Sequence, residues 1–92
     1  MAYDYAFSKI EKLYMEAIDH MNRLQENLPN ADWVEQTTKK SMIASCRIEF
    51  KAAANTVIEI FIELSGGDGL WRDLFEKYVE YDNDLEKRIP EY

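Results

Sequence analysis

The stretch from Trp33 to Ser65 contains neither glycine nor proline, and this continuity most constrains the fold. Apolar residues recur along it at alternating steps of three and four: Ile43, Cys46, Phe50, Ala53, Val57, Ile60 and Leu64. That rhythm is typical of one buried helical face. Asp32, with Glu35 three residues later, forms a capping box that predicts where the helix begins. We therefore expect a single long helix over residues 33–64.

The residues before Pro29 follow the same rhythm. The apolar positions are Phe7, Ile10, Tyr14, Ala17, Met21, Leu24 and Leu28, with Leu13 and Ile18 widening the stripe. Charged side chains lie between them, as expected of a helix with one solvated face. The pattern predicts a helix over residues 3–27, which ends because Pro29 disfavours helical geometry at the residue before it.

A third periodic run follows the glycines. Its apolar residues are Trp71, Leu74, Phe75, Tyr78, Tyr81, Leu85 and Ile89, and Pro90 ends it. This predicts a helix over residues 69–89, although Asp82 to Asp84 leave open a break followed by a short terminal turn. Three helices with short connections predict one all-α domain over residues 1–92, an antiparallel three-helix bundle with a long central helix.

Composition restricts the function. The chain has 92 residues, 47% of them hydrophobic, and a net charge of −7. Such an acidic chain is a poor direct partner for nucleic acid or anionic membrane, because both are bound through clustered Lys and Arg. No apolar run approaches the roughly 18 residues of a membrane span. Cys46 has no second cysteine to pair with, so we expect a reducing, cytoplasmic location.

The sequence "GGDG", residues 66–69, resembles the glycine-rich nucleotide loop of the NAD kinase and diacylglycerol kinase families. That loop is usually followed by Thr, whereas Leu70 follows here. The resemblance covers four residues, and flanking Glu63 and Asp73 would repel a phosphate. We interpret the glycines as a turn in which Gly66 or Gly67 ends one helix and Asp68 caps the next.

Two groups of polar side chains bear on the question of a metal site. His20 and Glu16 share one helical face and could share a metal. Glu16 and Asp19, together with Glu59 and Glu63, resemble the magnesium-binding carboxylates of helical nucleotide pyrophosphatases, but only "EAID" has that family's spacing. Cys46 falls in the apolar register and is expected in the core. We expect no catalytic residue, no metal and no cofactor.

Acidic residues follow one line of the third predicted helix. Asp73, Glu76, Glu80 and Asp84 are spaced by three, four and four, and Asp82 lies close by. A row of like charges slightly destabilises a helix. Solubility alone would explain the row, and a surface of fixed charges that binds a cationic groove is the alternative. Tyr78 and Tyr81 could add rigid aromatic contacts. By contrast, Lys40, Arg47 and Lys51 on the second helix form a modest basic ridge that we interpret as a solvated face.

These observations predict a non-catalytic protein-binding module, an inhibitor or adaptor whose acidic helix engages the basic surface of a nucleic-acid-handling protein. Its general character resembles phage-encoded inhibitors and nucleic-acid mimics, without a shared motif. Two alternatives remain open. One is a structural protein that forms a homodimer through the start of the second helix or through surplus apolar surface such as Trp33 and Trp71. The other is a magnesium-dependent phosphohydrolase.

Overall fold

The computed structural model describes residues 2–26, 32–65 and 70–89, and these residues form three α-helices. They are α1 (Ala2–Gln25), α2 (Trp33–Ser65) and α3 (Leu70–Arg88). Within the described segments there is no strand, which confirms the all-helical prediction. Each observed helix end lies within two residues of its predicted position. The predictions for Leu28, Gly66, Gly67 and Asp68 fall outside the described residues.

The beginning of α2 shows how the sequence starts a helix. The Glu35 backbone N–H donates to Oδ1 of Asp32 at 2.8 Å, and the Gln36 N–H donates to the Asp32 carbonyl oxygen at 2.9 Å. Asp32 thereby satisfies an amide that has no partner inside the helix. The Glu35 carboxylate pairs with Lys39 at 3.2 Å, one turn further along the same helix.

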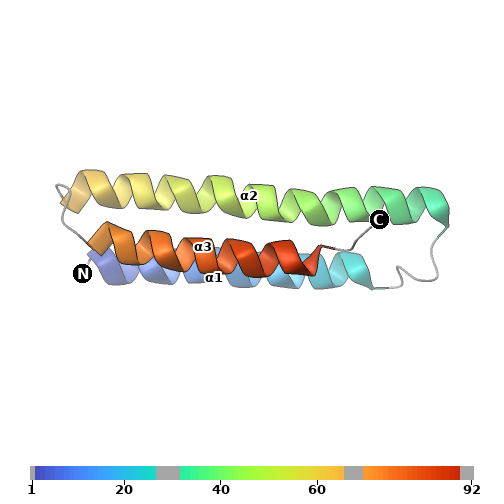
Figure 1. Cartoon of the computed structure of the whole chain (residues 1–92), viewed down its shortest axis with the longest axis horizontal. Helices are drawn as coiled ribbons and strands as arrows, with labels where there is room; N and C mark the ends of the chain where they lie inside the picture. The colour runs from blue at the N-terminus through green and yellow to red at the C-terminus, as the bar shows by residue number, and fades with distance from the viewer. Residues whose placement is uncertain (1, 27–31, 66–69, 90–92) are drawn as a thin grey trace.

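The three helices lie side by side in an elongated molecule that measures 51 × 18 × 16 Å (Figure 1). Tyr3, near the start of α1, packs against Phe61, near the end of α2, with ring centroids 6.2 Å apart. Further along, Tyr14 of α1 meets Phe50 of α2 edge to face at 6.3 Å. The first turns of α2 extend beyond the ends of α1 and α3 (Figure 1), and Trp33 there is 78% exposed.

The core follows one stripe on each helix. Its largest fully buried side chains are Ile10, Met21, Ile43, Leu74 and Leu85. They pack against other buried residues, which include Ala6, Ala17, Cys46, Phe50, Ala54, Ile58 and Phe61. Because all three helices contribute to this cluster, each helix depends on the other two for burial of its apolar face.

The buried stripe of α2 departs from the predicted one after Phe50. The buried positions are Ala54, Ile58 and Phe61, whereas Ile60 and Leu64 are 51% and 74% exposed. The prediction for Ile60 and Leu64 was therefore wrong. A strict seven-residue repeat drifts by about 20° per heptad on a straight helix, so the face that meets the core moves along the sequence.

The helix α3 continues through Asp82, Asn83 and Asp84 to Arg88. The alternative of a break there was therefore wrong. Asp and Asn weaken helices because their side chains compete for nearby backbone groups. Here both aspartate side chains bind partners on other side chains instead, so this competition is removed.

Replacement of two isoleucines of α2 by alanine tests which residues form the core. Ile43 is fully buried, whereas Ile48 on the same helix is 66% exposed. Ile43→Ala should lower the free energy of unfolding by about 2–5 kcal/mol, because it removes buried methyl groups and leaves a cavity. Ile48→Ala should change it by less than about 0.5 kcal/mol. Urea unfolding of both variants measures the difference, and equal losses would contradict the core described above.

Candidate protein-binding face

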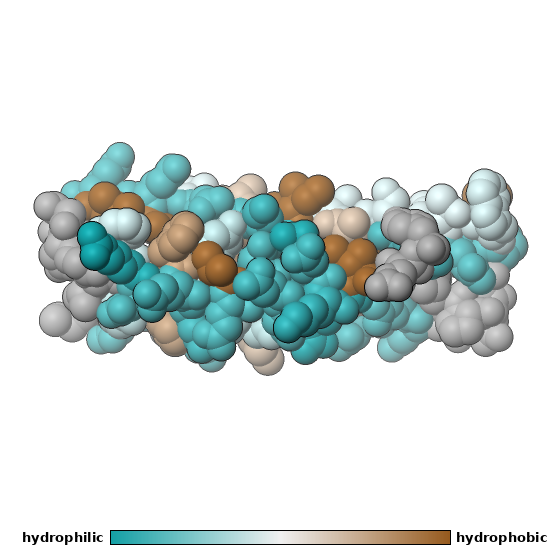
Figure 2. Space-filling view, viewed as in Figure 1, coloured by the Kyte–Doolittle hydropathy of each residue, from teal (hydrophilic) through white to brown (hydrophobic). Residues whose placement is uncertain are grey.

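Three of the predicted partner-binding acids lie on the surface of α3. Asp73, Glu76 and Glu80 are exposed, and we call these three residues the acidic face. Hydrophilic side chains cover much of the molecule on the side where α3 lies in front (Figures 1 and 2). Lys77 is the near counter-charge, with its Nζ 3.5 Å from Glu80. The side chains of that pair are 33% and 69% exposed, and exposed pairs of this kind contribute little to stability.

Tyr81 lies at the margin of the acidic face. Its ring is half-buried and stacks on the ring of Tyr14 of α1, with centroids 4.0 Å apart and planes 11° from parallel. The Lys77 ammonium lies 5.1 Å from the Tyr81 ring centroid. Burial raises the pKa of Tyr81, the Lys77 ammonium opposes this rise, and the carboxylates of Glu11 on α1 and of Glu80 add to it. Glu11 therefore brings a negative charge close to α3, a contribution that the sequence analysis missed.

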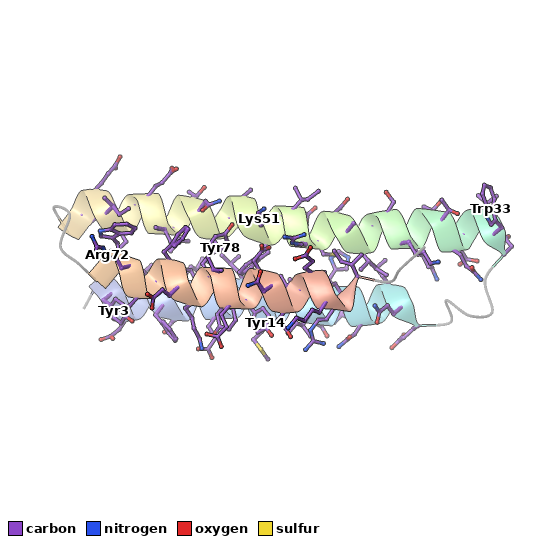
Figure 3. All side chains as sticks on the ribbon, in the orientation of Figure 1. Tyr3, Tyr14, Trp33, Lys51, Arg72 and Tyr78 are labelled. Carbon is purple, nitrogen blue, oxygen red and sulfur yellow. The ribbon has the colours of Figure 1, made fainter. Side chains whose placement is uncertain are left out.

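Tyr78 lies inside the core, although the sequence analysis placed it in the binding set. It is 6% exposed, and its ring stacks on Phe50 with centroids 5.8 Å apart. The Asn55 amide donates to its hydroxyl at 3.5 Å, and Tyr78 occupies the space between α2 and α3 (Figure 3). A side chain in this position stabilises the bundle and offers almost no surface to a partner.

Asp82 is 9% exposed and binds Arg47 of α2 through two hydrogen bonds. Arg47 donates from Nε to Oδ1 at 2.9 Å and from Nη2 to Oδ2 at 3.0 Å. The hydrogen bonds from Arg47 lower the pKa of Asp82, against the opposing effect of burial. Two parallel bonds to a carboxylate fix geometry as well as charge, so this pair sets where α3 lies on α2.

Asp84 lies on the opposite side of α3 and contacts α1. It accepts hydrogen bonds from the Tyr14 hydroxyl and from Nε of Arg88, the latter at 2.8 Å. The Arg88 bond and then the Tyr14 bond lower the pKa of Asp84. Figure 3 shows Tyr14 at this junction. The carboxylate that the sequence analysis placed in the outer line thus links α3 to α1.

The predicted binding set therefore divides into two groups. Asp73, Glu76 and Glu80 face solvent, and Tyr81 borders them. The other three members, Tyr78, Asp82 and Asp84, hold α3 against α2 and α1. The spacing of Asp82 and Asp84 in the sequence indicates part of this difference. Asp82 and Asp84 are two residues apart, so they point about 200° apart around a helix and cannot share one face.

The carboxylates proposed for a pyrophosphatase-like site do not come together. Glu16 and Glu49 line one hollow between α1 and α2, so they lie at the same level of the bundle. Glu59 lies ten residues further along α2, about 15 Å away at 1.5 Å per residue. Across residues 2–26, 32–65 and 70–89, no group of three or more His, Cys, Asp or Glu could hold a metal ion.

Cys46 is 3% exposed, and burial raises the pKa of its thiol. A buried thiol is less readily ionised and is therefore a poor nucleophile. Among the described helices, none is long and apolar enough to cross a bilayer.

Comparison of the chain with protein-family models, with curated proteins and with solved structures finds no significant match.

The division into anchoring and exposed acids predicts different effects on stability. Asp82→Asn should destabilise the fold by about 2 kcal/mol, because it weakens two charge-assisted hydrogen bonds inside a largely buried pair. Asp73→Asn, the matched change at an exposed acid of the same helix, should cost less than about 0.5 kcal/mol. Denaturant unfolding at pH 7 compares the two. A larger loss in Asp73→Asn would reverse the assignment.

The same pair predicts a pH dependence. The folded-state pKa of Asp82 lies below its usual value of 3.8, so its contribution to stability is fully present above that value. It is lost as pH falls through the folded-state pKa, because the unfolded chain binds the proton first. The stability difference between the wild-type chain and Asp82→Asn should therefore shrink below pH 4. A difference that stays constant between pH 6 and pH 3, measured by urea unfolding, would contradict this.

Proposed function

We propose that this antiparallel three-helix bundle is a non-catalytic protein-binding module, an inhibitor or adaptor that presents its acidic face to a basic surface of a nucleic-acid-handling protein. The observation that carries the proposal is the exposure of Asp73, Glu76 and Glu80 on the same helix whose other aspartates, Asp82 and Asp84, are paired. The charges of the exposed acids are not used to hold α3 against α1 and α2.

The spacing of the acidic face supports an interaction with a cationic groove. Seven residues of helix separate Asp73 from Glu80, a rise of about 10.5 Å. The three negative charges are therefore about 5 Å apart on average, compared with a phosphate about every 3.4 Å along one strand of DNA. A rigid row of this density would steer association with a basic surface and compete there with nucleic acid.

Rigidity distinguishes this row from an acidic tail. Leu74, between the first two acids, is fully buried, and Tyr78 and Leu85 continue the same buried line. A partner would therefore meet charges that are already ordered, and binding would cost little conformational entropy. Tyr81, which is stacked on Tyr14, would provide a pre-positioned aromatic edge beside Glu80. The size and charge of the chain suit a cytoplasmic inhibitor of the kind that phages encode.

Release of proteins from DNA tests this proposal. Proteins in an extract of the source organism are bound to DNA-cellulose, and the purified chain is added in excess. The wild-type chain should release a subset of them, and the release should weaken as salt rises, because exposed charges are screened. The triple variant Asp73→Lys, Glu76→Lys, Glu80→Lys should release none of that subset, although its helical circular dichroism is retained.

A control variant separates the acidic face from net charge. Glu26, directly after α1, and Glu59 and Glu63 on α2 are exposed acids, so their replacement by Lys changes the net charge by the same amount. This control should release the same proteins as the wild-type chain. Equal release by the triple variant of α3, or equal loss in both variants, would contradict a specific role of the acidic face.

A further inference from the structure

A groove between α1 and α2 faces away from the described part of α3. At one end it forms a hollow of about 470 Å³ lined by residues that include Tyr5, Ile60 and Leu64. These three apolar side chains are 73%, 51% and 74% exposed. A second hollow, of about 240 Å³, is lined by residues that include Glu16 and Glu49.

The two hollows lie one after the other along the groove between α1 and α2. On α1 their lining residues include Tyr5, Lys9, Leu13, Glu16 and His20, which recur at steps of three and four and so share one side of the helix. Tyr14, which contacts α3, lies on the other side of the same helix. The helix α2 therefore has apolar residues toward the core and further apolar residues, such as Ile60 and Leu64, toward the groove. A helix that is apolar on several sides is typical of one with neighbours on several sides.

We propose that a second copy of this chain occupies the groove and that the two copies run antiparallel, α1 against α1 and α2 against α2. The charges along the groove favour this arrangement. Lys9 lies in the apolar hollow, whereas Glu16 and Glu49 line the second hollow. Glu16 follows Lys9 by seven residues, about 10.5 Å along the axis.

A two-fold axis across the groove, level with the midpoint between Lys12 and Leu13, makes these charges complementary. In an interface of this symmetry, residue i of one copy meets residue j of the other and j meets i. Lys9 of each copy then lies opposite Glu16 of the other, because the two positions are equally far from the axis. The same operation pairs position 2 with position 23, so almost the whole of α1, Ala2–Gln25, overlaps in the dimer.

The apolar residues support the same register. Leu64 lies at the end of the groove near the start of α1. Its two-fold related level on α2 is close to Met42, which is 45% exposed and lies on the side of α2 that Glu49 and Ile60 share. Ala17 and Ala53 line the second hollow, and such small side chains allow two helix pairs to approach closely.

Charge also excludes the parallel alternative. A two-fold axis along the bundle would place α1 of one copy against α2 of the other at equal levels. Glu16 would then meet Glu49 of the second copy, since both line the same hollow. Like charges facing each other across an interface oppose association. The antiparallel dimer leaves α3 outside, so both acidic faces stay exposed and the proposed function does not depend on this inference.

Sedimentation analysis of the full chain tests the dimer. The wild-type chain should show a mass near twice its 10.9 kDa at micromolar concentration. Lys9→Glu should raise the dissociation constant at least about tenfold, because it places two like-charged pairs in the interface. Lys87→Glu, the same charge change at an exposed position of α3, should leave the dissociation constant unchanged.

A charge swap tests the register. The double variant Lys9→Glu, Glu16→Lys restores opposite charges in the antiparallel arrangement only, so it should return the dissociation constant to near its wild-type value. A wild-type chain that stays monomeric up to about 100 µM would overturn the proposal, because its dimer would then be too weak for a specific interface. So would a dimer that Lys9→Glu does not weaken or that the double variant does not rescue. Helical circular dichroism of each variant confirms that it is folded.

Discussion

The ion pair between Arg47 and Asp82 determines how the third helix lies on the other two. The helix α3 is short and strongly charged, and its buried line consists of few side chains, among them Leu74, Tyr78 and Leu85. Apolar packing alone permits such a helix to rotate or slide, because dispersion and burial are weakly directional. Two parallel hydrogen bonds from Arg47 to one carboxylate define a single position.

A second anchor on the opposite side completes the arrangement. Asp84 accepts a hydrogen bond from the Tyr14 hydroxyl of α1, and the Tyr14 ring stacks on Tyr81 and meets Phe50 edge to face. Tyr14 therefore contacts both other helices at one level of the bundle. With α3 held on both sides, Asp73, Glu76 and Glu80, which lie about one to three turns before Asp84, face solvent in a fixed line. The geometry of the acidic face follows from the anchoring of its neighbours.

The periodic part of the fold could be predicted from the sequence. Continuous three-four spacing, the Asp32 cap and the two prolines gave three helices with ends close to those observed. The burial of Ile60 and Leu64 was predicted wrongly, because a seven-residue repeat does not show where a straight helix turns away from its neighbour. Which residues of α2 face α1, α3 or the open groove depends on how the helices pack.

Only part of the candidate site could be predicted, because the packing of the helices also decides which of its residues are exposed. A row of acids on one helix is visible in the sequence, and Asp73, Glu76 and Glu80 do lie exposed. Spacing within one helix could not show that Arg47, which was interpreted as part of a solvated basic ridge, would reach Asp82 across 35 residues of sequence. Nor could it show that Tyr78 would face Phe50. Asp82 and Tyr78 hold the helices together, and do not bind a partner, because a second helix supplies the group that each of them contacts.

The most direct test of this account is a double-mutant cycle between Arg47 and Asp82. The free energies of unfolding are measured for the wild-type chain, Arg47→Gln, Asp82→Asn and the double variant. If the pair positions α3, the two changes should be coupled by about 1–3 kcal/mol, so that the double variant loses much less than the two single losses added together. Losses that simply add would show that Arg47 and Asp82 act independently, and they would contradict the anchoring of α3 on which the acidic face depends.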